Sequence, residues 1–185
     1  KPSIDTGMGL ERIASVLQGA STNYDTDLFL PIIDKVRQIA GTPFETQDHV
    51  FASRVIADHI RACTFLAADG VHPSNEGRGY VMRRVLRRAV RFGRMLGIQR
   101  PFMAELVPVV VDIMGDAYPE VSTKAEYIMQ ILTRDEQRFL NTLEDGQLRA
   151  AQLIAAAKQK GSKVLPGEDA FLLYDTFGFP IDLTK

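Results

Sequence analysis

The stretch KAEYIMQILTRDEQRFLNTLEDGQLRAAQLIAAAKQK, residues 124–160, carries the longest hydrophobic pattern of the chain. Its large apolar side chains recur at helical spacing, at Ile128, Ile131, Leu132, Phe139, Leu143 and Leu153. This spacing predicts one long helix, which Ser122 or Thr123 begins and Gly146 bends. A helix of this length sets the fold class of the chain, because a packed bundle must cover its apolar side.

Shorter patterns of the same period extend outward on both sides. They predict helices over 10–18, from a cap at Asp25 or Thr26 to Gly41, from a cap at Asp48 to Gly70, over 78–96, over 102–114 and over about 168–176. The valine cluster within 102–114 is also compatible with a strand. Strand signals are otherwise nearly absent, apart from a short segment before Gly7. We therefore expect a mainly α helical bundle with one or two long helices and a short strand remnant at the N-terminus.

The composition excludes several classes of protein. Hydrophobic residues make up 45% of the chain and charged residues 24%, which is typical of globular proteins. Cys63 is the single cysteine and there are three histidines, so neither a disulfide nor a His/Cys metal site is expected. A reducing cytoplasm is the expected compartment, and no apolar run is long enough to span a membrane. Both ends stop in mid-pattern, which suggests a segment of a longer protein.

The charge distribution is uneven although the net charge is only −1. No acidic residue lies between Glu76 and Glu105, whereas eight arginines lie between Arg78 and Arg100. On the helix expected over 78–96, one face is apolar and should pack on the core, with Val81, Val85, Ala89, Phe92 and Leu96 along it and Met82, Leu86 and Val90 widening it.

The arginines occupy the two flanks of this expected helix. Arg84, Arg88 and Arg91 form one flank, and Arg83, Arg87 and Arg94 form the other. Like charges at this spacing repel one another, and phosphate groups of a nucleic acid would relieve the repulsion. Arginine favours phosphate because its planar fork binds two oxygens. The alternative is that these arginines pair with acids elsewhere in the fold, which are plentiful between Glu126 and Asp145.

The N-terminal segment DTGMGLER, residues 5–12, reads as a glycine-spaced turn that opens into a helix. Gly7 and Gly9 allow close approach of a ligand, and a helix N-terminus with Arg12 in its first turn suits phosphate. Asp5 is placed to receive an ammonium group. On spacing alone, an ordinary tight turn with a surface arginine remains the alternative.

Two further polar residues are candidates for recognition. Asn75 precedes the basic helix in a polar loop and carries both donors and acceptors. Asp175 lies near a helix end, where a carboxylate gains nothing from the helix dipole. The alternatives are an ordinary turn asparagine and an exposed acid beside an aromatic turn. We interpret His59 as a satisfied, partly buried histidine and Cys63 as a core residue.

Four sequence blocks resemble the class II aminoacyl-tRNA synthetases of the alanyl type, in the same order and across essentially the whole chain. They are 5–12, 54–61, the pair 73–76 and 78–84, and 173–180. The resemblance implies that 1–20 end the catalytic domain and that 21–185 form a helical tRNA-recognition domain. It implies ATP contacts by Gly9 and Arg12, and alanine contacts by Asp5 and Gly7.

The resemblance further implies that the chain recognises the acceptor stem of alanine tRNA. The RNA contacts would be Asn75, Asp175, Arg78, Arg83, Arg84, Arg87, Arg88 and Arg91. Asn75 and Asp175 would read a G·U wobble pair, because a carboxylate and an amide oxygen can accept from the guanine 2-amino group. ATP and Mg²⁺ would serve the full-length enzyme, with no DNA or membrane partner.

Alone, this segment is expected to bind neither cofactor and to be inactive. The alternative function is a non-catalytic helical module that binds nucleic acid or protein.

Overall fold

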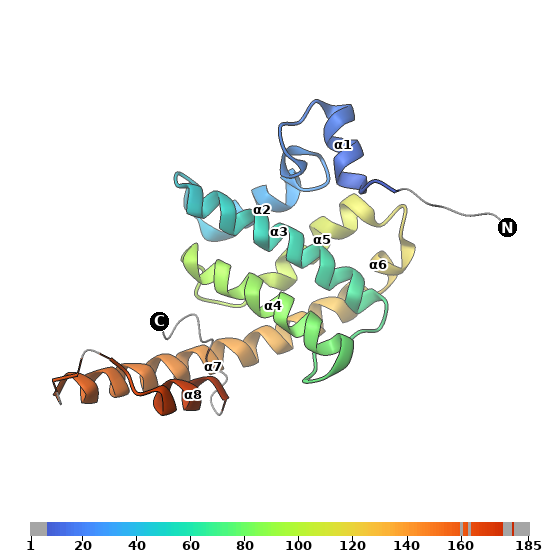
Figure 1. The fold of residues 1–185 in the computed structure, drawn as a ribbon. Coiled ribbons are helices and arrows are strands. Elements are labelled where there is room, and N and C mark those ends of the chain that lie inside the picture. The colour runs from blue at the N-terminus through green and yellow to red at the C-terminus, as the bar shows by residue number, and fades with distance from the viewer. Residues whose placement is uncertain (1–6, 160, 163, 176–178, 180–185) are drawn as a thin grey trace. The chain divides into compact units, whose positions relative to one another are not determined.

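The computed structural model describes residues 7–159, 161–162, 164–175 and 179. Within these it is built from helices (Figure 1). They are α1 (Leu10–Gln18), the short 3-10 helix η1 (Asn23–Asp25), α2 (Leu30–Ala40), α3 (Gln47–Ala68), α4 (Gly77–Met95), α5 (Met103–Met114), α6 (Pro119–Thr123), α7 (Ala125–Gln159) and α8 (Gly167–Asp175). The mainly α class is confirmed. The strand remnant expected before Gly7 lies outside the described residues.

The chain divides into two compact units, residues 1–136 and 137–185. In the first unit α3 is central, packing against α2, α4, α5 and α6 (Figure 1). It is buried on several sides, because Ile56, Ile60 and Cys63 are fully enclosed and small residues such as Ala52 admit neighbouring helices. The interpretation of Cys63 as a core residue is confirmed, and burial raises the pKa of its thiol to about 12.

Helix ends follow local chemistry that the sequence carries only in part. Gly19 and Gly41 end α1 and α2 as predicted, in left-handed conformation at φ 63° and 67°. The predicted cap of α3 at Asp48 is wrong. Thr46 occupies the N-cap, and its hydroxyl accepts from the backbone N–H of His49 at 3.2 Å.

Two other predicted caps are wrong because extra short helices use those residues. Neither Asp25 nor Thr26 is the N-cap of α2, which is Phe29, since Asp25 ends η1 and accepts from the backbone N–H of Thr22 at 3.0 Å, and Thr26 is the C-cap of η1. Ser122 and Thr123 do not cap the long helix, since both belong to α6. Neither η1 nor α6 is long enough to leave a periodic apolar pattern in the sequence.

The valine-rich segment 102–114 is a helix, which settles the strand alternative. A side chain from α7 caps it. Glu136 accepts from the backbone N–H of Phe102 through Oε1 and of Met103 through Oε2, both at 3.0 Å. The Glu136 carboxylate thereby satisfies N–H donors that the start of α5 leaves without a partner in the helix. Burial nevertheless raises the pKa of Glu136 to about 7.

The second unit contains the latter part of α7 together with α8. Gly146 lies inside the continuous helix α7, where a Cβ would meet the ring of Phe179 at 2.2 Å. Phe179 and Leu173 are both buried, and the N–H of Phe179 donates to the carbonyl of Leu173 at 2.9 Å. The absence of a side chain at Gly146 therefore makes room for an aromatic ring.

The boundary predicted at residue 20 concerns domains of a larger protein and stays a prediction. The division between compact units falls much later, between Glu136 and Gln137, within the long helix.

Candidate nucleic-acid interface

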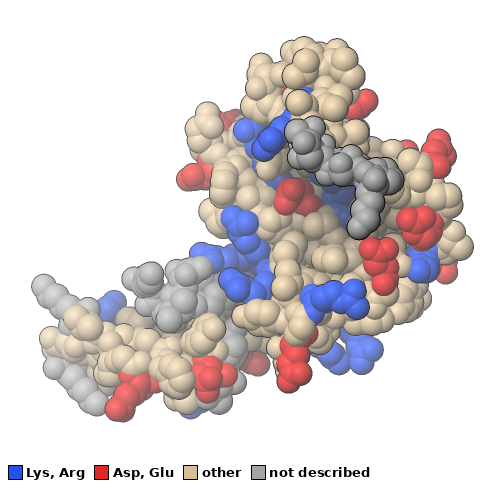
Figure 2. Space-filling view, turned by 45° about the vertical axis from the view of Figure 1, so that its right-hand side comes forward, with Lys and Arg blue, Asp and Glu red and all other residues tan. Residues whose placement is uncertain are grey.

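Helix α4 carries its basic residues as predicted, but its buried face is narrower. Met82, Leu86, Ala89 and Val90 are buried, whereas Val81 is 56% exposed. The prediction that Val81 packs on the core is wrong, because the buried face is centred one residue further along. Figure 2 shows one face of the molecule, on which Lys and Arg side chains lie at several places over the first unit, with Asp and Glu side chains between them.

The flank of Arg83 and Arg87 turns toward an acid inside the first unit. Arg83 Nε lies 3.5 Å from Asp135 Oδ1, with side chains 20% and 6% exposed. Burial lowers the pKa of Arg87, and the positive charge of Arg83 lowers it further. The negative charge of Asp135 acts in the opposite direction and raises this pKa. Internal pairing, the alternative left open by the sequence, is therefore realised for Arg83, with an acid between Glu126 and Asp145.

The other flank faces outward. On it, Arg84 and Arg88 are exposed and Arg91 is half-buried, and Arg78 in the first turn of α4 is exposed as well. The guanidinium of Arg84 lies 5.7 Å from the ring centre of Tyr80, which leaves its edges open to solvent. Such an exposed guanidinium can donate to two phosphate oxygens without breaking an internal ion pair.

Arg88 is held by a short polar relay from α3. Its Nη1 lies 3.2 Å from His59 Nε2, and His59 Nδ1 lies 2.9 Å from Asp58 Oδ2. Because arginine only donates, Nε2 must accept, and Nδ1–H then donates to Asp58. This hydrogen bond lowers the pKa of Asp58. His59 is thus satisfied and nearly buried, as interpreted from the sequence, and it orients Arg88.

Asn75 lies in a tight loop directly before α4. Gly77 has φ +56°, and Ser74 N–H donates to the carbonyl of Gly79 at 3.1 Å. A Cβ on Gly79 would meet both the His72 carbonyl and Ser74 Oγ at 2.2 Å, so this position requires glycine. The Asn75 side chain is exposed, and its Oδ1 accepts from Arg83 Nη1. One lone pair of the expected acceptor is therefore already engaged.

The N-terminal segment places Arg12 in the first turn of α1, as predicted, with Gly9 as N-cap. Arg12 is exposed, and its guanidinium has no partner among the described residues. Glu11 lies beside it and bonds to its own backbone N–H, which lowers its pKa and partly offsets the positive potential of the helix end. Gly7 is exposed as well, whereas Asp5 lies outside the described residues.

Two arginines of α3 contact the part of the chain before α2, Arg61 at α1 and Arg54 at η1, and sequence reasoning missed their role. Arg61 forms an ion pair with Glu11, and its guanidinium lies 4.3 Å from the ring centre of Phe29. Arg54 Nη2 lies 3.6 Å from Asp25 Oδ1. The sequence did carry a signal for this role, because Arg54 and Arg61 are seven residues apart and therefore lie on one side of the helix.

The apolar side of α1 does not pack within the described chain. Leu10, Ile13 and Leu17 are 53%, 45% and 80% exposed. The amphipathic pattern therefore predicted the helix bounds correctly, although no residue of α1 is buried in the described structure.

The tail residue Asp175 is the last residue of α8 in the second unit. Its side chain is exposed and has no partner among the described residues, which fits both an outside partner and the alternative of an exposed acid, so its role stays a prediction. Tyr174 beside it is 50% exposed, while Leu173 supplies the buried contact.

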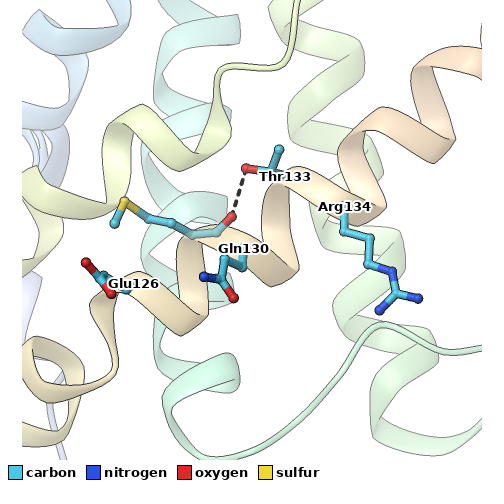
Figure 3. A pocket seen from close by; sticks show the side chains of 5 residues that line it. Glu126, Gln130, Thr133 and Arg134 are labelled. Atoms are coloured by element: carbon cyan, nitrogen blue, oxygen red, sulfur yellow. Dashed lines mark hydrogen bonds between the residues drawn. The ribbon is translucent and has the colours of Figure 1, made fainter.

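A shallow hollow of about 530 Å³ lies on α7 within the first unit, lined by Glu126, Met129, Gln130, Thr133 and Arg134. Figure 3 shows these side chains projecting from successive turns, with Thr133 Oγ1 donating to the Met129 carbonyl at 2.8 Å. Its one acid and one arginine balance in charge, so it offers no clear preference for a charged ligand. Among the described residues no acidic or His/Cys cluster is suited to a metal ion, and no helix there is long and apolar enough to cross a membrane.

Comparison with known proteins decides the family. The profile of the tRNA synthetases class II (A) matches residues 1–185, the whole chain. The chain belongs to this class II tRNA synthetase family. Among its relatives are alanine–tRNA ligases of Geobacillus kaustophilus (strain HTA426), 59% identical, Geobacillus thermodenitrificans (strain NG80-2), 56%, and Shouchella clausii (strain KSM-K16), 54%.

These matches cover 100% of this chain but only 21% of each ligase. The class II synthetase chain thus spans about a fifth of the length of the curated relatives that it matches.

Proposed function

We propose that this chain is the part of an ATP-dependent alanine–tRNA ligase that holds the acceptor stem of alanine tRNA. The observation that carries the proposal is the set of exposed arginines on α4, which follows directly after the exposed Asn75: Arg84 and Arg88 on one flank and Arg78 in the first turn. Several permanent positive charges on one helix suit a duplex backbone, and a polar side chain before the helix suits a base edge.

Within this proposal the arginines differ in what they contribute. Arg78, Arg84 and Arg88 contact phosphate directly. Arg87 and Arg91, which are half-buried, border the same surface. Asn75 and Asp175 read the G·U wobble pair, with Asp175 accepting from the guanine 2-amino group.

The N-terminal segment contributes part of the ATP and alanine site. Arg12 is the residue that would hold phosphate oxygens, since its guanidinium is free of described partners and Gly9 opens the helix beside it. Gly7 and Asp5 would border the alanine. When bound, ATP with Mg²⁺ would supply the adenylyl group that activates alanine, with pyrophosphate leaving, and no Mg²⁺ ligand is proposed from the described residues. The proposed compartment is the cytoplasm.

The proposal is tested by binding of the chain to labelled acceptor-stem duplexes that differ only in G·U or G·C, followed by fluorescence anisotropy. We expect the wild-type chain to prefer G·U by about tenfold, since a mismatched pair costs ~1–3 kcal/mol. Arg84→Gln should weaken both duplexes alike and reduce the salt dependence by about one phosphate contact. Asn75→Ala should remove the preference.

The second candidate is a protein-interaction module, which the pairing of Arg83 with Asp135 favours. This alternative predicts weak duplex binding with no dependence on the G·U pair. Equal affinity of the wild-type chain for both duplexes would contradict the ligase proposal, and binding that is insensitive to salt would favour the alternative.

A further inference from the structure

We propose that Arg83 is a positioning residue, which together with Asp135 fixes the orientation of the Asn75 side chain and does not itself bind RNA phosphate. The inference rests on the proposed function of Asn75, and it revises the expectation that Arg83 is one of the phosphate contacts. Here the loop before α4 and α4 itself, which are adjacent in the sequence, meet the distant α7.

The contacts form a chain from the interior to the surface. Asp135 is buried, and its Oδ1 lies 3.5 Å from Arg83 Nε. Arg83 is 20% exposed and donates from Nη1 to Asn75 Oδ1. Asn75 is exposed. One guanidinium therefore connects a buried carboxylate to a surface amide.

The ion pair with the buried Asp135 keeps the Arg83 side chain in place. If Arg83 swung outward to a phosphate, the Asp135 carboxylate would lose its ion pair at 3.5 Å in a nearly closed site, one of the two guanidinium charges, of Arg83 and Arg87, that act on it. Breaking one half of a buried pair is costly, because the remaining charge is desolvated. Arg84, the next residue, faces solvent and has no such cost. Neighbouring arginines on α4 therefore have different roles.

The exposed end fixes which atoms Asn75 presents. An arginine has donors only, so the oxygen of the amide and not its nitrogen must face Arg83. Both N–H groups of the amide and one lone pair of Oδ1 are left for a ligand. The backbone is also held, because Ser74 N–H bonds to Gly79 and the close approach at Gly79 admits no side chain. A side chain ordered in advance loses less entropy on binding.

The test compares Arg83→Gln and Arg83→Lys with the control Arg84→Gln in the 185-residue chain. Affinities for the G·U and G·C duplexes are measured by anisotropy, and the side-chain amide signal of Asn75 is followed by ¹H–¹⁵N NMR without RNA. Arg83→Lys keeps a positive charge beside Asp135 but loses the planar fork, so it guards against a folding defect.

We expect both Arg83 variants to reduce the G·U preference from about tenfold to about twofold with G·C affinity nearly unchanged. Arg84→Gln should weaken both duplexes equally. Both Arg83 variants should shift the Asn75 amide signal, and Asn75→Ala combined with Arg83→Gln should lose no more preference than Asn75→Ala alone.

Equal weakening of both duplexes by Arg83→Lys, with the preference intact, would overturn the inference and return Arg83 to the phosphate contacts. An unmoved Asn75 signal in that variant would overturn it as well. A wild-type chain without any G·U preference would instead sink the proposed function, and the NMR signal would still decide whether Arg83 orients Asn75.

Discussion

Glu136 illustrates how one side chain can serve two helices and tie stability to pH. Its carboxyl group comes from α7 and accepts from two backbone N–H groups at the start of α5. Burial disfavours the charged form, whereas the two N–H donors favour it, and burial is the larger effect. The result is a carboxyl group with a pKa of about 7 instead of 4.5.

The sign of the resulting pH dependence follows from linkage. Between pH 4.5 and 7 the folded chain holds a proton on Glu136 that the unfolded chain has released. The stability from this group is therefore fully present below pH 4.5 and is lost as the pH rises through 7. Its upper limit is roughly 3 kcal/mol, at about 1.4 kcal/mol for each pKa unit.

We predict that Glu136→Gln removes this dependence, because an amide does not titrate. Urea unfolding of the wild-type chain and the variant at several pH values between 5 and 8 measures it. The wild-type free energy of unfolding should fall relative to that of the variant as the pH rises, and other titrating groups cancel in the difference. Parallel pH profiles would show that the carboxyl group titrates at its ordinary pKa.

At the scale of helices, α1 differs from the rest because polar contacts attach it. None of its residues is buried. The Glu11–Arg61 ion pair links it to α3, and Gln18 bonds to Asp27 through both its oxygen and its nitrogen, at 3.1 and 2.7 Å. Helical propensity alone does not hold a segment this short, so these contacts should determine its stability.

We predict that Glu11→Gln loosens α1 without affecting α3. The Arg61 and Glu11 side chains are 15% and 26% exposed, so the pair should contribute on the order of 1 kcal/mol. That corresponds to an increase of about fivefold in amide hydrogen exchange across Leu10–Gln18. Arg12→Gln is the matched control, since its guanidinium has no described partner. Unchanged exchange in α1 after Glu11→Gln would mean that other contacts hold the helix.

The helices themselves were largely predictable from the sequence, and their connections were not. Periodic apolar residues and terminal glycines located α1, α4 and α7 to within a residue or two. Glu11 and Arg61 are 50 residues apart, and Glu136 and Phe102 are 34 apart, so no local rule could pair them. One clue was available for Asp135, because it lies between Leu132 and Phe139 on the apolar side of its helix and so needs a buried partner.

The candidate interface shows the same limit. The excess of arginine on α4 was visible in the sequence, and so was the choice between phosphate and internal acids. Only the fold could show whether a given arginine pairs with an internal acid or faces outward. Arg83 and Arg84 are neighbours in the sequence, yet Arg83 faces Asp135 and Arg84 faces solvent. Residue type predicted the chemistry, whereas only packing could assign the partner.

At the scale of the whole chain, the two units are expected to respond separately to mutation. In the second unit, Phe179 packs on Gly146 and bonds through its N–H to Leu173, which is fully buried in α8. Two opposing effects decide the outcome of Gly146→Ala. Alanine favours the helix by roughly 0.5–1 kcal/mol. A methyl group 2.2 Å from the Phe179 ring forces the ring to move, which costs about 1–3 kcal/mol.

We predict that the steric cost exceeds the helical gain, so that Gly146→Ala destabilises the second unit alone. Amide hydrogen exchange should rise in α8 and at Phe179, while α3 and α4 keep their protection, because the packing that changes lies within residues 137–185. Gly167→Ala is the matched control, since a Cβ there has no neighbour within 4 Å. Faster exchange spread equally over both units would contradict the prediction, because it would mean that the two units unfold as one cooperative body.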